Sequence, residues 1–260
     1  MNEPVELNLE PVSRRRTYEE VVEQIRRKIL DGELRVGDRL PGERQLSEML
    51  GVSRASVREA MRVLESMAII RARTGTGPGS GSVIVGEPGP ALGDTLIMNA
   101  ALATISLDEV IDVRCMLERA AILQVIERAD AASIAELRGL VEAMRAESDA
   151  RIFLGYDAEF HLRLAEVSGN RLLAYLMASL RGVIHEVLSR IFPHVAEWDD
   201  LRPVVVEEHA EIVDLIEARD AAAAVERLEA HIRHSLDRIQ RANPQGGALG
   251  SIVGDEEGSS

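Results

Sequence analysis

The amino-acid sequence predicts a mainly α-helical protein in which a small N-terminal domain with one β-hairpin precedes an all-helical domain. The chain of 260 residues is long enough for two domains of ordinary size. Aromatic residues make up 3% of it, whereas Ala, Leu, Val, Arg and Glu are abundant, and this composition favours helices over sheets. β-like runs occur only before residue 86, and helical spacing of apolar residues prevails after it.

Charge divides the chain at the same place. Residues 13–86 carry 14 Lys and Arg against 10 Asp and Glu, a net charge of +4, whereas residues 87–260 carry 16 against 31, a net charge of −15. The total of −14 therefore hides a basic segment, and only this segment suits a polyanion such as nucleic acid. The single cysteine, Cys115, excludes a disulfide framework within one chain.

No membrane partner is expected from the sequence. The N-terminal residues lack the apolar core of a signal peptide, and the most apolar stretch, 96–107, is short and interrupted by polar residues. A cytoplasmic protein follows. We expect five segments: a flexible arm (1–12), the basic domain (13–86), a linker (87–91), the helical domain (92–242) and a disordered glycine-rich tail (243–260).

The basic domain is predicted to contain a winged helix-turn-helix. An amphipathic helix ends at Asp31-Gly32, and two further helices, near 43–50 and 54–67, flank a tight Gly-Val-Ser turn. Helix, turn, helix is the layout in which the second helix enters the major groove of DNA. Two β-like runs, 69–73 and 82–85, then flank a glycine-rich tip and predict a hairpin, the wing. A phosphate loop is excluded there because a strand rather than a helix follows.

Polar residues at the start of the second helix are suited to reading DNA. Ser53 is placed to cap this helix, and Arg54, Ser56 and Arg58 lie in its first turns. Arginine pairs bidentately with guanine, and serine and arginine both hold phosphates. A solvated helix face beside an apolar stripe would show the same pattern, so the motif alone leaves both interpretations open.

The remainder of the chain is predicted to form an all-α bundle, because apolar residues recur at helical spacing and no strand pattern interrupts them. The expected helices cover approximately residues 92–104, 107–129, 133–148, 151–168, 170–191, 203–218 and 221–241.

Four polar residues on three of these helices are candidate metal ligands. Asp157 and His161 stand four apart and share one face of a helix, and His209 and His231 lie in apolar surroundings on two others. Three imidazoles and a carboxylate suit a divalent ion such as Zn²⁺, Ni²⁺ or Mn²⁺. Hydrogen-bonded core histidines would fit the spacing as well, so the residues alone leave the site undecided.

Two stretches of sequence resemble a known family. Residues 37–70, "GDRLPGERQLSEMLGVSRASVREAMRVLESMAII", resemble the DNA-binding domain of the GntR family of bacterial regulators. The motifs "VIDVRCMLERAAI", "DAEFHLRLAEVSGNRLL", "EEHAEIVDLIEARD" and "AHIRHSL" resemble the FCD ligand-binding domain of its FadR subfamily. The resemblance implies a winged helix-turn-helix followed by an FCD-type bundle of six or seven helices, and the helix near 92–104 favours seven.

The resemblance also implies roles for particular residues. It implies one divalent metal ion per chain, held by Asp157, His161, His209 and His231, with a small organic acid as effector on the open coordination positions. Arg114 would face that cavity, although a salt bridge between helices is an alternative, and Asn170 would line it, although capping of the next helix is an alternative. The implied DNA contacts are Arg44, Ser53, Arg54, Ser56, Arg58 and a wing glycine, Gly75 or Gly77.

The function predicted from sequence is therefore regulation of transcription without catalysis. We expect a metabolite-responsive repressor that binds a palindromic double-stranded operator as a homodimer and leaves it when the effector binds. One alternative is a metal-dependent hydrolytic enzyme that uses the Asp and three His, but it gives the basic domain no purpose. An activator of the same fold is the other alternative.

Overall fold

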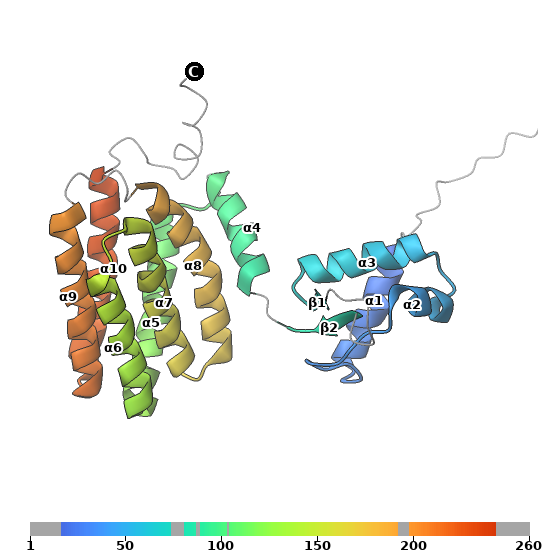
Figure 1. Cartoon of the computed structure of the whole chain (residues 1–260), viewed down its shortest axis with the longest axis horizontal. Coiled ribbons are helices and arrows are strands. Elements are labelled where there is room, and N and C mark those ends of the chain that lie inside the picture. Colours follow the sequence, from blue (N-terminus) through green and yellow to red (C-terminus); the bar gives the residue numbers. More distant parts are fainter. Residues whose placement is uncertain (1–16, 74–80, 87–88, 103, 192–197, 243–260) are drawn as a thin grey trace, which may run out of the picture. The chain divides into compact units, whose positions relative to one another are not determined.

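The computed structural model describes residues 17–73, 81–86, 89–102, 104–191 and 198–242. The chain separates into two compact units, Met1–Pro88 and Gly89–Ser260, which are described in turn (Figure 1).

The first unit is a three-helix domain with a hairpin, which confirms the predicted winged helix-turn-helix. Strands β1 and β2 are antiparallel, with Ile70 opposite Ile84, and an isolated antiparallel bridge between Arg39 and Val83 adds a second pairing. The tip of the wing, with Gly75 and Gly77, lies outside the described residues. The elements are α1 (Thr17–Leu30), α2 (Glu43–Leu50), α3 (Arg54–Ser66), β1 (Ile70–Arg73) and β2 (Gly81–Ile84).

The turn between α2 and α3 follows from its residues. Gly51 has φ +64°, a left-handed conformation that ends α2 and that glycine adopts without steric cost. Ser53 then caps α3, because its Oγ accepts a hydrogen bond from the Ser56 backbone N–H at 3.1 Å. The apolar stripe of α3 fixes its orientation, since Val57 and Leu64 are fully buried against α1, α2 and the hairpin.

The second unit contains seven helices within the described residues, in agreement with the predicted all-α bundle. Helix α5 is central, because it contacts α7, α8, α9 and α10, while α4 packs on α8 (Figure 1). None of the described helices combines the length and the apolarity needed to cross a membrane. The helices are α4 (Gly89–Ala101), α5 (Leu107–Arg128), α6 (Ala131–Ala146), α7 (Ala150–Val167), α8 (Arg171–Ile191), α9 (Trp198–Glu217) and α10 (Ala221–Ala242).

Two helix starts differ from the sequence prediction. Helix α4 begins at Gly89, so the end of the predicted 87–91 linker is helical. Helix α9 begins at Trp198 and not at Pro203, which lies inside its second turn and costs one backbone hydrogen bond. Packing offsets that cost, because the Trp198 ring meets Phe153 edge-on at 5.0 Å and its indole N–H donates to the Ser148 carbonyl oxygen at 3.1 Å.

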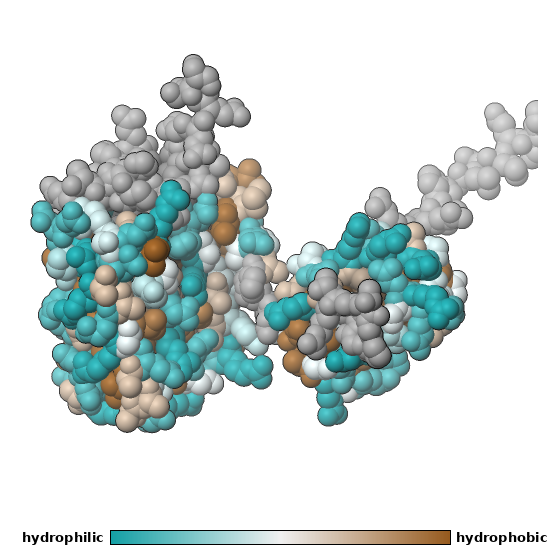
Figure 2. Space-filling view, in the orientation of Figure 1, coloured by the Kyte–Doolittle hydropathy of each residue, from teal (hydrophilic) through white to brown (hydrophobic). Residues whose placement is uncertain are grey.

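Apolar side chains from most of the helices form the core of this unit. Phe153, Phe160, Leu164, Ile122 and Ile212 are almost completely buried in it. On the side drawn in Figure 2, polar residues cover most of the bundle and apolar residues lie in small scattered groups. The apolar positions of the sequence therefore lie mainly in the core and the polar positions mainly on the surface. The polar residues that are nevertheless buried need a separate explanation.

Substitution Ser106→Ala should destabilise this unit through the start of α5. Ser106 and Glu109 form a capping box, in which Ser106 Oγ accepts from the Glu109 N–H and Glu109 Oε2 accepts from the Ser106 N–H. We expect the free energy of unfolding to fall by about 1 kcal/mol in urea titrations followed by the fluorescence of Trp198, the single tryptophan. The control Thr95→Ala, at an exposed position of α4, should change it by less than about 0.5 kcal/mol.

Candidate metal centre

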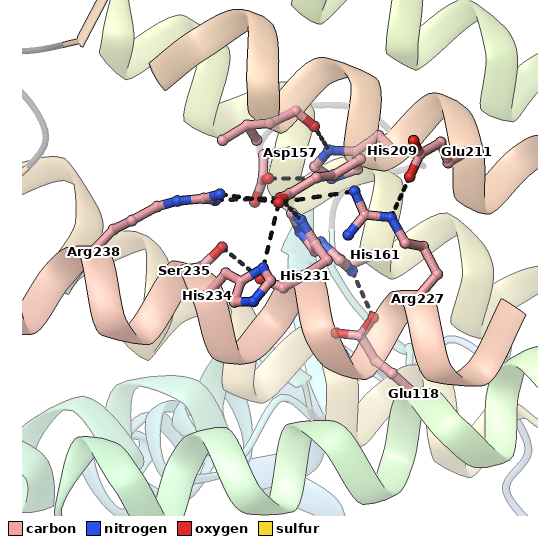
Figure 3. A network of polar contacts seen from close by, with 12 residues as sticks. Glu118, Asp157, His161, His209, Glu211, Arg227, His231, His234, Ser235 and Arg238 are labelled. Atoms are coloured by element: carbon pink, nitrogen blue, oxygen red, sulfur yellow. Dashed lines mark hydrogen bonds and ion pairs between the residues drawn. The ribbon is translucent and has the colours of Figure 1, made fainter. Parts of the chain in front are cut away.

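One acid and three histidines meet inside the helical unit. Asp157 and His161 come from α7, His209 from α9 and His231 from α10, and each offers a ligand atom within 4.8 Å of the others (Figure 3). All four are buried, His209 completely. The structure thus brings together the four predicted ligands, although they lie on three helices and up to 74 positions apart in the sequence.

Each histidine turns its Nδ1 toward an oxygen that accepts a hydrogen bond. A carboxylate or a carbonyl oxygen cannot donate, so each Nδ1 carries a proton and, in the neutral ring, Nε2 keeps its lone pair. The contacts are His161 Nδ1 to Glu118 Oε2 at 2.5 Å, His209 Nδ1 to the Val205 carbonyl oxygen at 2.8 Å, and His231 Nδ1 to Glu208 Oε2 at 2.8 Å.

The remaining nitrogen atoms fit a cation. Nε2 of His161 and Nε2 of His209 are buried and have no hydrogen-bond partner among the described residues. Asp157 Oδ1 lies 3.3 Å from His209 Nε2, a separation at which both atoms could bind the same cation. The two atoms do not have the geometry of a hydrogen bond. Buried lone pairs that face one another are costly unless a positive charge lies between them. The group could therefore hold a metal ion, and nitrogen and oxygen ligands suit Zn²⁺, Ni²⁺ or Mn²⁺.

The protonation states also suit metal ligation. Burial alone would raise the pKa of Asp157, but the surrounding histidines hold it well below its usual value, so the carboxyl group is ionised. Burial and the neighbouring His209 lower the pKa of His231 to about 3. Burial and the charge of Arg114 likewise lower the pKa of His161. Asp157 is thus a carboxylate, and His161 and His231 are neutral imidazoles, which are the forms that bind metals.

A small cavity adjoins the cluster and contains Arg114. Its polar lining consists of Arg114, Asp157, His161, Arg181 and His185, and the rest is apolar. Arg114 is buried and donates from Nε to Glu118 Oε1 at 2.5 Å. Both residues belong to α5, so this ion pair lies within one helix and is not the bridge between helices that was the alternative for Arg114.

Asn170 lies elsewhere. It is exposed, its Oδ1 accepts a hydrogen bond from the Leu173 N–H at 3.2 Å at the start of α8, and it is absent from the cavity lining. Helix capping, the alternative considered for this residue, accounts for the contact.

The predicted DNA contacts lie on α2 and α3. Arg44, Arg54 and Arg58 are exposed, and Arg44 has one loose ion pair, 4.0 Å from Glu48. The hydroxyl groups of Ser53 and Ser56 are 2.9 Å apart and bond to each other at the first turn of α3. Three guanidinium groups are therefore available to a polyanion on this unit.

Sequence reasoning missed three residues around the metal cluster: Glu118, Glu208 and Arg238. Glu118 follows Arg114 by four positions, a spacing that could have indicated a pair on one helix face. Glu208 directly precedes His209, but nothing in the sequence shows that it turns inward. Arg238 donates to both oxygens of Glu208, at 2.9 and 3.2 Å (Figure 3).

Comparison with known proteins agrees with both units. Residues 17–78 match the family described as bacterial regulatory proteins, gntR family, and residues 109–234 match the FCD domain. A protein of Escherichia coli (strain K12), to which regulation of the L-lactate dehydrogenase operon is ascribed, is 30% identical over 84% of this chain and 84% of its own length. The HTH-type transcriptional repressor NanR of Citrobacter rodentium is 27% identical over 85% of each chain.

A solved structure shares the fold. The Streptococcus agalactiae GntR structure is 28% identical, covers 84% of this chain and 98% of its own, and has a TM-score of 0.55. The chain belongs to the GntR family of bacterial transcriptional regulators, in the FadR subfamily that carries an FCD domain. Proteins of this family are transcriptional regulators and not enzymes, so the alternative of a hydrolytic enzyme is wrong.

The metal-free protein should lose stability as the pH falls from about 6.5, because unfolded histidine takes up a proton there whereas folded His231 stays neutral down to about 3. Each such histidine lowers the free energy of unfolding by about 1.4 kcal/mol per pH unit well below 6.5. Urea titrations of chelator-treated protein between about pH 7 and 5 would measure this slope. The variant His231→Asn should have a smaller slope than the parent, and an equal slope would contradict the assignment.

Proposed function

We propose that this regulator is a metabolite-responsive repressor that binds a palindromic operator as a homodimer and releases it when an organic acid binds beside a divalent metal ion. The observation that carries the proposal is the buried group of Asp157, His161, His209 and His231, in which Nε2 of His161 and of His209 has no partner among the described residues, next to a cavity that contains Arg114.

DNA binding is assigned to the exposed face of α3. Arg54 and Arg58 are exposed, and Ser53 fixes the start of their helix by its cap. The N-terminal residues of a recognition helix contact base edges, and guanidinium groups are suited to guanine. One winged helix covers only a half-site, so a homodimer on a two-fold operator gives the specificity that one copy lacks.

An anionic effector is favoured by the charges around the cavity. The four ligand residues would hold one divalent ion of the Zn, Ni or Mn type, which when bound supplies open positions for a carboxylate. With a divalent ion bound, the two positive charges of the ion would exceed the single negative charge of Asp157. The centre would then have a net positive charge and attract an anion. Arg114 and Arg181 add guanidinium groups to the same cavity wall, and such groups bind carboxylates bidentately.

Repression is supported by the relative NanR, whose name describes a transcriptional repressor. An effector releases DNA only to the extent that it binds the DNA-free state more tightly than the DNA-bound state. In this proposal the contacts of the organic acid with the metal-centre cavity supply the free energy that favours the DNA-free state. The dimer leaves the operator because those contacts require a different dimer geometry.

Substitutions Arg54→Ala and Arg58→Ala should each weaken operator binding by about 1–3 kcal/mol, because each removes a contact at the start of the recognition helix. Gel-shift titrations at one fixed salt concentration, on an operator recovered from genomic fragments that the protein retains, would measure the loss. The control Arg151→Ala removes an exposed arginine of the helical unit and should leave affinity unchanged. Parent-like binding by both α3 variants would refute the assignment.

Substitution His209→Ala should remove the metal without removing DNA binding, because His209 belongs to the helical unit and not to the basic one. We expect about one divalent ion per parent chain by elemental analysis of protein purified without chelator or added metal. The control His185→Ala, which changes a cavity residue outside the ligand group, should keep the metal. A metal-free parent that still responds to organic acids would sink the proposal, as would a His209→Ala variant with full metal content.

A further inference from the structure

Two of the three clustered imidazoles are oriented by buried glutamates from other helices. Glu118 on α5 bonds to His161 of α7, and Glu208 on α9 bonds to His231 of α10. Both carboxylates are almost completely buried. His209 differs, because its Nδ1 donates to the Val205 carbonyl oxygen one turn earlier in its own helix.

Each glutamate is in turn held by an arginine. Arg114 donates from Nε to Glu118 Oε1 at 2.5 Å, and Arg238 contacts both oxygens of Glu208. Two chains of polar contacts result, each running from an arginine through a glutamate to a histidine: Arg114–Glu118–His161 and Arg238–Glu208–His231. Both chains end on a histidine of the candidate metal centre, and Nε2 of His161 has no hydrogen-bond partner among the described residues.

Stability of the fold alone does not account for these chains. A buried ion pair loses the hydration of both charges, and replacement of such pairs by apolar residues of similar volume is often neutral or stabilising. Apolar residues at 118 and 208 would fill the core of the bundle at lower cost. The charged residues are explained if the bundle needs a hydrogen-bond acceptor behind each ring.

We propose that Glu118 and Glu208 are positioning residues that hold His161 and His231 as Nδ1–H tautomers with Nε2 directed into the metal centre. This inference rests on the proposed function for the ion but adds two residues that never touch it. An acceptor behind a ligating imidazole fixes the ring orientation, excludes the tautomer with a proton on Nε2 and strengthens Nε2 as a donor. Arg114 and Arg238 donate hydrogen bonds to the two carboxylates and so hold them in place.

The simpler reading is that the glutamates only tie helices together, α5 to α7 and α9 to α10. That reading predicts the same Nδ1–H tautomers and a loss of stability when either glutamate is changed, but no effect on metal affinity in the folded protein. Metal affinity and the spectrum of the bound metal in folded variants therefore separate the two interpretations.

The tautomers are measured on the unmodified full-length protein. Long-range proton–nitrogen correlation spectra of chelator-treated, histidine-labelled protein distinguish a proton on Nδ1 from one on Nε2, and single His→Gln variants assign the signals. We expect Nδ1–H for His161 and His231. A proton on Nε2 of either ring would overturn the proposal for that ring, whether or not the protein binds metal.

Variants then test the effect on the ion. Glu118→Gln and Glu208→Gln should weaken Zn²⁺ binding about 10- to 100-fold in competition with a chromophoric chelator. Each should also change the visible absorption spectrum of the Co²⁺-loaded protein, which reports the ligand set. The matched controls, Glu127→Gln on α5 and Glu207→Gln on α9, alter exposed glutamates of the same helices and should leave both readouts unchanged.

The outcomes separate this inference from the proposed function. Zn²⁺ affinity within about threefold of the parent in both Gln variants, with unchanged Co²⁺ spectra, would overturn the positioning role while the metal centre stands. Failure of the parent itself to bind Zn²⁺ or Co²⁺ would overturn the metal part of the proposed function. If circular dichroism shows that one Gln variant does not fold, the Zn²⁺ affinity and the Co²⁺ spectrum of the other variant decide the case.

Discussion

Burial of an ionised aspartate among three imidazoles constrains the whole helical unit. Asp157, His161, His209 and His231 lose their hydration, and each must regain polar contacts inside the bundle. The contacts come from α5 and α9 through Glu118 and Glu208, which need Arg114 and Arg238 in turn. A polar network of this size specifies how α5, α7, α9 and α10 pack, because an apolar core would tolerate several arrangements.

The fold was readable from sequence where local patterns determine it. The Gly51 turn, the Ser53 cap and the apolar stripe of α3 are set by residues within a few positions of each other, and the structure has them as expected. The start of α9 was not readable, because Pro203 signals a first turn whereas Trp198 extends the helix by packing on Phe153. That contact joins residues 45 positions apart, beyond the reach of local patterns.

The candidate site was readable in part for the same reason. Asp157 and His161 are four apart, so one helix face carries both, but their meeting with His209 and His231 is a tertiary event that only the family resemblance supplied. Glu118 and Glu208 were missed because a charged residue on a helix is usually solvated. The exposed positions of α5 carry charges such as Asp112 and Arg119, as that rule expects, whereas Glu118 lies on the face of α5 that packs against α7.

The backbone contact of His209 has a consequence for the order in which the centre assembles. Its ring is oriented by a carbonyl oxygen of the preceding turn, so α9 can present this ligand as soon as the helix itself has formed. His161 and His231 acquire their orientation only after side chains of neighbouring helices have docked. The polypeptide thus begins with one competent ligand and gains the others late, so capture of an ion would complete the folding of the bundle and not nucleate it.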